Sequence, residues 1–235
     1  MVSIFPEIAR KGMGKLCGRG YRCISLATAV DSLRRRTCFP GRSFAITFDD
    51  GYESVYKQAF PLLQLHSLTA TVFLTIGDGE GARAEGRLPS MQGRDMLTWA
   101  QIREMHRWGI AFGAHTLTHP DLTRLPLDQV RSQICHSKRL IEDALGTRVA
   151  SFAYPYGRYD RKVREVAEQN FDCACSDKLG LVRLSSDLYA LERVDAYCLR
   201  KDWGFDLMSS RLLPWYLRIY RVLRWGRMKI NARRP

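Results

Sequence analysis

The chain has 235 residues, is 46% apolar and carries a formal net charge of +13. This length suits one domain with a sizeable core, or one domain plus a tail, and the apolar content excludes bulk disorder. No run of about 18 apolar residues occurs, so no transmembrane helix is expected. The N-terminal segment lacks the apolar stretch and cleavage pattern of a secretory signal peptide.

Cysteine usage favours a reducing compartment. The seven cysteines are odd in number and include no CxxC pair, so reduced thiols in a cytoplasm are the simplest interpretation. We expect Cys173 and Cys175 to pack within a strand rather than to bind a metal.

Strand and helix patterns alternate from Ser43 onward, which is typical of an α/β domain with parallel strands. β-branched and aromatic runs predict strands at 43–48, 69–75, 110–115 and 149–155, with shorter ones near 171–174 and 188–194. Helical spacing predicts helices at 52–65, 98–108, 126–145 and 161–169. A capping box of Thr98 and Gln101 opens the second helix, and Gly109 closes it.

A glycine-rich stretch, 77–96, interrupts this alternation. Its glycines resemble those of a phosphate-binding loop, but no GK[ST] sequence and no apolar helix follow. We therefore expect a mobile loop over the end of a strand.

Polar residues follow three of the predicted strands, in the segments TFDDG (47–51), AHTLTH (114–119) and FAYPYG (152–157). The carboxyl ends of parallel strands are where catalytic groups collect in α/β barrels. His115 and His119 stand four apart, so one helical turn would bring both imidazoles to one face. By its spacing alone, the pair would favour a structural role over metal binding. Beside two adjacent aspartates it predicts a metal site with open positions, and one carboxylate left to act as a base.

These motifs, in the order TFDDG, H-[ST]-x-x-H and P-Y-G, resemble those of polysaccharide deacetylases of the NodB type, carbohydrate esterase family four. The resemblance covers about residues 20–194. It implies a distorted (β/α) barrel of about seven strands and metal-dependent removal of an N-acetyl group from an amino sugar. It also implies that Asp50, His115 and His119 bind the metal and that Asp49 is the general base. The metal would be zinc, with cobalt, nickel, manganese or iron as alternatives.

The chemistry suits these residue types. A divalent metal lowers the pKa of water from 15.7 to about 7, and Asp49 would take the proton as water attacks the amide. By resemblance, the backbone N–H of Tyr156 would bind the oxyanion, and Pro155 and Gly157 would line the substrate site. The metal would also offset the repulsion between the two neighbouring carboxylates.

The sequence departs from the family pattern in three ways. Ala153 and Tyr154 stand where many members carry an arginine that orients the base, so Asp49 is expected to be less rigidly held. No late histidine is present to act as general acid, since His136 is the last. Finally, there is little room for the strand that usually precedes the segment GYRCISLATAVDSL, so we expect a late start or a more open barrel.

Several other residues suggest structural roles. We expect His66, His106 and His136 to be surface or packing residues, and Trp99 and Trp108 to be helix core residues rather than sugar-stacking platforms. The arginines at 34–36 are most simply a solvated helix end.

The basic residues concentrate at the C-terminal end. From Leu207 to Pro235 there are eight basic residues and no acidic one, which leaves +5 of the net charge for residues 1–206. On a helical wheel one arc holds Leu212, Trp215, Tyr216, Ile219, Val222 and Leu223, and the other holds Arg218, Arg221, Arg224 and Arg227. We expect a deacetylase domain at 1–206 and a basic amphipathic tail at 207–235. The helix at 211–227 either docks on the barrel or lies on an anionic membrane; a nucleic acid partner is unlikely because no recognised motif accompanies the arginines.

The sequence therefore predicts a metal-dependent N-deacetylase of a polysaccharide or a lipid-linked glycan, cytoplasmic and peripheral on the inner membrane. The alternatives are a catalytically silent sugar-binding or metal-binding barrel, a deformylase or deacetylase of a soluble sugar precursor, and a basic nucleic-acid-binding protein. Intact Asp49 argues against the silent barrel, because a binding protein needs no base.

Overall fold

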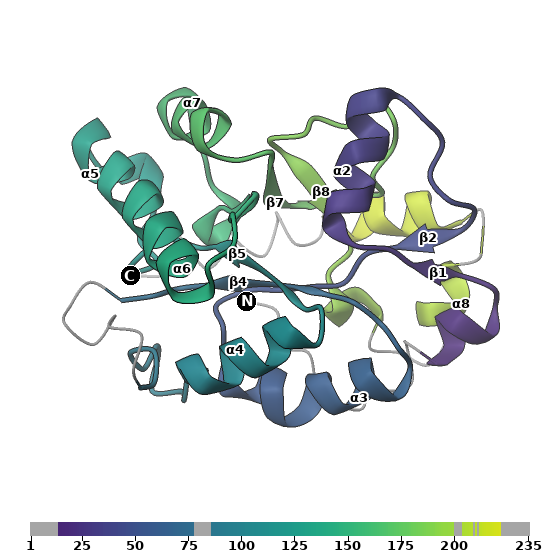
Figure 1. Cartoon of the computed structure of the whole chain (residues 1–235). Helices are drawn as coiled ribbons and strands as arrows, with labels where there is room; N and C mark the ends of the chain where they lie inside the picture. The colour runs from purple at the N-terminus through teal and green to yellow at the C-terminus, as the bar shows by residue number, and fades with distance from the viewer. Residues whose placement is uncertain (1–13, 78–85, 200–203, 209, 211, 222–235) are drawn as a thin grey trace, which may run out of the picture.

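The computed structural model describes residues 14–77, 86–199, 204–208, 210 and 212–221. Its centre is one curled parallel sheet whose six strands follow one another in chain order (Figure 1). The strands are β3 (Thr47–Phe48), β4 (Thr71–Leu74), β5 (Ala111–Ala114), β6 (Ser151–Ala153), β7 (Cys173–Leu179) and β8 (Leu191–Arg193). The expected α/β fold with a distorted barrel is confirmed, and its edge strands are β3 and β8.

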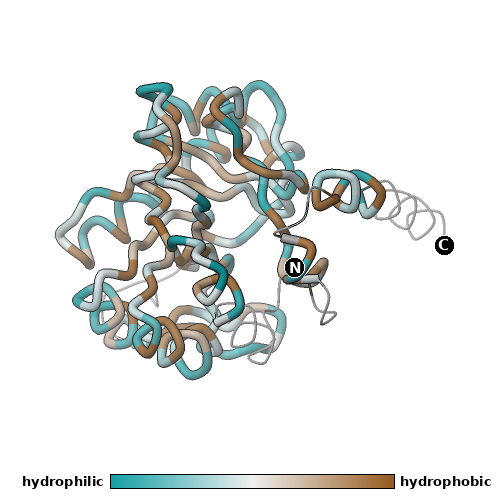
Figure 2. Tube along the Cα trace, turned by 90° about the vertical axis from the view of Figure 1, so that its right-hand side faces the viewer, coloured by the Kyte–Doolittle hydropathy of each residue, from teal (hydrophilic) through white to brown (hydrophobic). Residues whose placement is uncertain are grey.

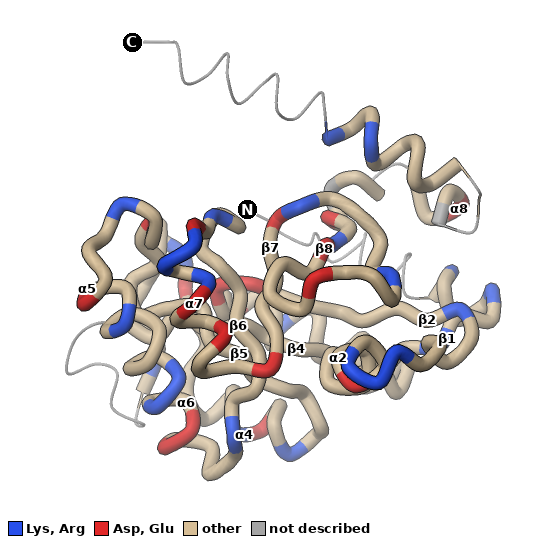
Figure 3. Tube along the Cα trace, turned by 90° about the horizontal axis from the view of Figure 1, so that it is seen from above, with Lys and Arg blue, Asp and Glu red and all other residues tan. Residues whose placement is uncertain are grey.

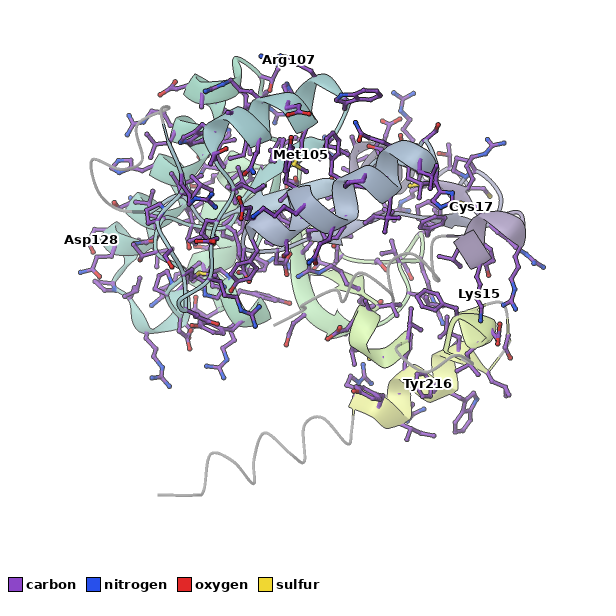
Figure 4. The ribbon with its side chains drawn as sticks, turned by 90° about the horizontal axis from the view of Figure 1, so that it is seen from below. Lys15, Cys17, Met105, Arg107, Asp128 and Tyr216 are labelled. Carbon is purple, nitrogen blue, oxygen red and sulfur yellow. The ribbon has the colours of Figure 1, made fainter. Side chains whose placement is uncertain are left out.

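Helices between consecutive strands cover one face of this sheet (Figure 1). They are α3 (Phe60–Leu65), α4 (Trp99–Arg107), the run α5 (Leu127–Arg131) to α6 (Ser137–Leu145), and α7 (Arg161–Asn170). The Thr98–Gln101 capping box is present, and Gly146 ends α6 in a left-handed conformation. Figure 4 shows α4 with Met105 and Arg107 labelled; Met105 is fully buried and Arg107 is exposed.

Two of the predicted helices contain π-helical turns. These are η1 (Val55–Ala59), which precedes α3, and η4 (Ser132–His136), which joins α5 to α6. Such turns are frequent near functional sites because they redirect side chains. Here η1 follows the two aspartates, and η4 carries Gln133, whose contacts are described below.

The prediction of one continuous strand at 43–48 is wrong, because this segment forms two short strands in different sheets. Residues Ser43–Phe44 form β2, which pairs in parallel with β1 (Arg22–Cys23) in a separate two-stranded sheet, and only Thr47–Phe48 join β4 as β3. The chain changes partners at Ala45 and Ile46, and the Ile46 carbonyl already accepts from Thr71. Pattern alone does not distinguish one strand from two that pair with different neighbours.

A second apolar cluster fills the opposite face of the main sheet. Helix α2 (Leu26–Arg35), capped by Ser25, packs Leu26, Val30 and Leu33 against residues that point inward from the strands. These are Phe73, Ala153, Cys173, Cys175 and Leu191. The interior of the curled sheet is therefore packed, and the expectation that Cys173 and Cys175 are strand-packing residues is confirmed.

The C-terminal segment packs beside the N-terminal helix 14–18. Arg19 contacts the Asp206 carboxylate and donates to the Phe205 carbonyl of α8 (Gly204–Met208), and Lys15 lies on the same side as Tyr216 (Figure 4). A further helix, 213–221, extends from the body (Figure 2). It buries Leu213 and Leu217, and the Tyr216 hydroxyl donates to the Cys198 carbonyl at 2.7 Å.

The docked face of this helix is not the predicted apolar arc. Leu213 and Leu217, which the arc did not include, are buried, whereas Leu212, Trp215 and Ile219 of the arc remain 62%, 66% and 56% exposed. Arg218 and Arg221 are also exposed, and basic positions recur along the helix (Figure 3). The predicted positions from Val222 to Arg227 lie outside the described residues. Among the described residues, no helix has the length and apolarity that crossing a bilayer requires.

Candidate active site

The two aspartates leave β3 through a strained three-residue turn. The Gly51 N–H donates to the Asp49 carbonyl at 2.9 Å, and Asp50 between them has φ of 72°. A positive φ is costly for a residue with a side chain. Gly51 itself has φ of 87°, and a Cβ there would come within 2.8 Å of Leu74. The turn therefore requires glycine and separates the directions of the two carboxylates.

A second strained turn follows β5 and carries both histidines. Thr116 has φ of 71° and His119 has φ of 56°, and the His119 N–H donates to Thr116 Oγ1 at 3.0 Å. The loop is held from outside by Gln133, whose Oε1 accepts from the Leu117 and Thr118 N–H groups, both at 3.0 Å. The predicted helical turn is thus wrong, although the two imidazoles do converge.

Strain concentrates at this site. Of the seven described non-glycine residues with positive φ, four lie in the predicted motifs: Asp50, Thr116, His119 and Tyr156. Each such conformation costs about 1–3 kcal/mol and persists only where the surroundings enforce it. Their clustering at adjoining strand ends is the backbone signature of a functional site.

Asp50, His115 and His119 form a group suited to a metal ion. Their ligand atoms lie within 4.8 Å of one another, and the Asp50 Oδ1 atom is 3.4 Å from His115 Nε2 and 3.5 Å from His119 Nε2. Ligands held about 2.1 Å from a tetrahedral zinc lie about 3.4 Å apart, so the spacing fits. The His115 Nδ1 atom lies 2.6 Å from the Ala153 carbonyl, which fixes this nitrogen as the donor and leaves Nε2 free to bind.

The electrostatics of this group show what competes with a metal. At His115, burial lowers the pKa, but the hydrogen bond with Asp50 and the charge of Asp49 outweigh it, so the pKa is raised. Burial and the neighbouring His115 lower the pKa of His119 to about 4. One imidazole therefore attracts a proton that a metal ion would have to displace.

Asp49 is held by an arginine that the sequence interpretation missed. Both of its carboxylate oxygens accept from the Arg193 guanidinium, Oδ1 from Nη1 at 2.7 Å and Oδ2 from Nη2 at 2.9 Å. Burial raises the pKa of Asp49, but the charges of Arg193 and His115 bring it down to about 2. The expectation that Asp49 is loosely held is therefore wrong. The signal available was an arginine at the end of the last predicted strand.

The P-Y-G segment forms a tight turn after β6. Pro155 is buried, Tyr156 has φ of 58°, and its ring lies 4.6 Å from that of His119. The Gly157 N–H donates to the Tyr154 carbonyl, and a Cβ on Gly157 would come within 2.4 Å of the backbone nitrogen of Asp177. The structure thus brings Tyr156 to the metal group and gives Gly157 a packing constraint of its own.

Arg158 extends the rim beyond Tyr156. Its guanidinium lies 5.9 Å from the centre of the Tyr156 ring and donates to Asp121 at 2.8 Å. Because Tyr156 is 52% exposed, an aromatic surface and a cation border the group of metal-binding candidates.

The glycine-rich segment is described from 86 onward; positions 78–85 lie outside the described residues. Arg87 ties the segment to the body, donating to Glu53 at 2.9 Å and to the Met96 carbonyl at 2.7 Å. Beneath it Tyr52 is buried, and burial with the charge of Asp50 raises the pKa of its phenol to about 12. A neutral phenol therefore lies close to Asp50, a second residue that sequence reasoning missed.

The remaining predictions fall away from the site. His106 contacts Thr147 and Phe112, His136 contacts Ser132, and neither joins the metal group. Trp99 is fully buried as expected, but the expectation that Trp108 is a core residue is wrong: it follows the last residue of α4 as its C-cap and is 64% exposed. Of the three arginines at 34–36, Arg34 donates a hydrogen bond to the Asp172 carboxylate at 2.9 Å.

Comparison with known proteins agrees with the motifs. The sequence profile described as polysaccharide deacetylase matches residues 36–170. The chain is 31% identical over 150 residues to YxkH of Bacillus subtilis, which is named as an inferred polysaccharide deacetylase, covering 63% of this chain and 50% of YxkH. It is 25% identical over 189 residues to the poly-beta-1,6-N-acetyl-D-glucosamine N-deacetylase of Staphylococcus aureus, covering 76% and 61%.

A solved structure agrees with the fold. The Streptococcus pyogenes deacetylase PplD, determined in complex with acetate, superposes with a TM-score of 0.72 at 25% identity, covering 80% of each chain. The chain spans only about half the length of YxkH.

Proposed function

Because this chain belongs to the polysaccharide deacetylase family of the NodB type, we propose that it is a metal-dependent hydrolase removing an N-acetyl group from an amino sugar. One observation carries the proposal: the Asp50 carboxylate faces two histidine Nε2 atoms at 3.4 and 3.5 Å, beside a second, firmly held carboxylate. A divalent cation held there would supply a water with its pKa lowered to about 7.

The residues of the chain account for the step in which water attacks the amide. Asp49 stays ionised because the positive charge of Arg193 stabilises the carboxylate. This carboxylate accepts the proton as water attacks the amide carbon. The Tyr156 N–H is assigned to the developing oxyanion, where a fixed donor contributes about 3 kcal/mol. Pro155 and Gly157 shape the turn that presents it. The Ala153 carbonyl orients His115 so that its Nε2 atom, the proposed metal ligand, faces Asp50.

The proposed substrate is an N-acetylated amino sugar within a glycan. The support is the name of the Staphylococcus aureus relative, a poly-beta-1,6-N-acetyl-D-glucosamine N-deacetylase, together with the exposed Tyr156 beside the site, since an aromatic face suits a sugar ring. A lipid-linked form of that sugar is the finer proposal, and it rests on the C-terminal helix.

The C-terminal helix supports a peripheral position on an anionic membrane. Its docked face is satisfied by Leu213 and Leu217, so the exposed stripe of Leu212, Trp215 and Ile219 is not needed for packing. Exposed arginines flank the stripe, and each basic residue near anionic lipid contributes about 1 kcal/mol. We assign this role to the proposed tail, 207–235, and place the enzyme on the cytoplasmic side.

The test is acetate release from a panel of N-acetyl sugars, free, polymeric and lipid-linked, with and without a chelator. N-formyl sugars belong in the panel, because a deformylase would prefer them. We expect release that stops with chelator and returns with added zinc. Metal binding without any release would instead favour the silent barrel.

A further inference from the structure

We infer that Arg193 is the positioning residue of the proposed reaction: from β8 it orients Asp49, which follows β3, so the position of the base depends on how these two edge strands approach each other. This inference rests on the proposed function. It assigns the orientation of the base to β8, whereas the segment that carries Pro155 and Tyr156 has no cationic side chain at Ala153 or Tyr154.

The contacts of Arg193 reach both sides of the gap between the edge strands. Its Nε donates to the Ser176 carbonyl of β7 at 3.0 Å, and its Nη1 also approaches Thr47 Oγ1 of β3 at 3.3 Å. Backbone hydrogen bonds do not pair β3 with β8, which are the two edges of the six-stranded sheet. The ion pair with Asp49 thus joins the edges through side chains.

The geometry suits orientation better than simple charge pairing. A guanidinium is planar and binds both oxygens of a carboxylate at once, which fixes the plane of Asp49 as well as its position. Each carboxylate oxygen keeps a second lone pair, so the base can still accept a proton. A lysine at this position would supply charge without fixing the plane.

The experiment compares Arg193→Lys and Arg193→Gln with wild type, measuring kcat, KM, bound metal and thermal midpoint on the metal-loaded full chain. We expect kcat to fall by about tenfold to a hundredfold, as for other residues that orient an active-site group, with KM changed by less than about threefold. Bound metal should stay unchanged, because Arg193 touches none of the three ligand candidates.

The matched control is Arg164→Lys. Arg164 makes a similar two-pronged pair with Asp187, at 2.5 and 2.9 Å, but on α7 away from the strand-end site. It should retain wild-type kcat. In an Asp49→Asn background, Arg193→Lys should lower the residual rate no further, since Arg193 acts through Asp49.

Three results would overturn the inference: wild-type kcat in folded Arg193→Lys, metal loss that parallels the rate loss, or full additivity with Asp49→Asn. These leave the proposed function standing. A wild-type protein that releases no acetyl group from any substrate overturns the proposed function and this inference together.

Discussion

Two regions of the molecule each receive one carboxylate from the dipeptide Asp49–Asp50. The first, which we call the edge, is the carboxyl end of β5 and β6, where the metal-binding candidates lie. The second, which we call the seam, is the gap between β8 and β3. Asp50 turns toward two imidazoles at the edge, and Asp49 turns toward a guanidinium at the seam. The two regions differ in what their partners permit. The imidazoles bind a metal in their neutral form, so they leave Asp50 able to share a cation with them. The positive charge of Arg193 instead keeps Asp49 ionised and able to act as a base.

The strained turn is what separates the two regions. β3 ends at Phe48, and the positive φ of Asp50 and the Gly51 to Asp49 hydrogen bond then set the directions of the two carboxylates in place of the alternation of a regular strand. Adjacent residues can therefore serve different partners, and the repulsion expected between two neighbouring carboxylates is offset on both sides.

The largest expected effect is at the edge. Asp50→Asn and His115→Ala remove proposed ligands, so metal affinity should fall by more than about a hundredfold, the upper range for disturbing residues that only support ligands. Turnover should be lost with the metal. Metal analysis after dialysis checks this, and undiminished stoichiometry in both variants would remove the edge from the proposed site.

The next effect belongs to the seam. Asp49→Asn should lower kcat by about a hundredfold to ten-thousandfold, since an amide cannot take the proton from water. Bound metal and KM should be retained, in contrast to Asp50→Asn. If the two asparagine variants behave alike, the division of roles between edge and seam is wrong.

Residues close in the chain were predictable, and those joined by distant contacts were not. Each ligand candidate stands just after an apolar run, so the motif positions and the order of the strands could be predicted from local pattern. Arg193 pairs with an aspartate 144 positions away, and the partner change at Ala45 depends on which strand lies alongside. The position of Arg193 at a predicted strand end was visible in the sequence, but which residue it pairs with leaves no local signal, and neither does the partner change.

The histidine pair shows a subtler limit. Spacing of four correctly predicted that His115 and His119 converge, but for the wrong reason. They meet through two residues in left-handed conformation and the support of Gln133, not through a helical turn. Strain of this kind is enforced by surrounding structure and cannot be derived from propensity.

A substitution at Gly157 tests whether this glycine is needed for the stability of the turn or for contact with the substrate. Gly157→Ala should destabilise the fold by about 2–4 kcal/mol, because it combines a strained φ with overpacking against Asp177. Gly146→Ala is the matched control: its φ is also positive but nothing lies within 4 Å of its Cβ, so only the conformational cost of about 1–2 kcal/mol remains. Denaturant unfolding measures both. A raised KM with unchanged stability would instead make Gly157 a substrate contact.

Metal affinity should depend on pH because the carboxylates at the edge and at the seam both act on His115. The pKa of His115 is raised by Asp50 and Asp49, so below that pKa the metal must displace one proton, and affinity should fall about tenfold per pH unit. His119, with its pKa lowered to about 4, adds no second proton above that pH. Zinc competition with a chelator across about pH 5 to 8 measures the slope. An affinity independent of pH would contradict the assignment of His115.

The smallest expected effect lies outside the barrel, in the exposed stripe of helix 213–221. Trp215→Ser should weaken binding to anionic vesicles by roughly thirtyfold, since burying a large apolar side chain contributes about 2 kcal/mol. Trp108→Ser is its match, because Trp108 is 64% exposed against 66% for Trp215 but follows the C-terminal end of α4, away from the basic helix. Flotation with anionic and neutral vesicles at low and high salt separates the causes, because screening weakens only the contribution of Arg218 and Arg221. Acetate release from a small free sugar should be unchanged in both variants, since neither tryptophan contacts the edge or the seam. Equal flotation of the two variants would mean that the stripe has no part in membrane binding. If the wild type does not bind either, the helix is only a docked element of the barrel wall.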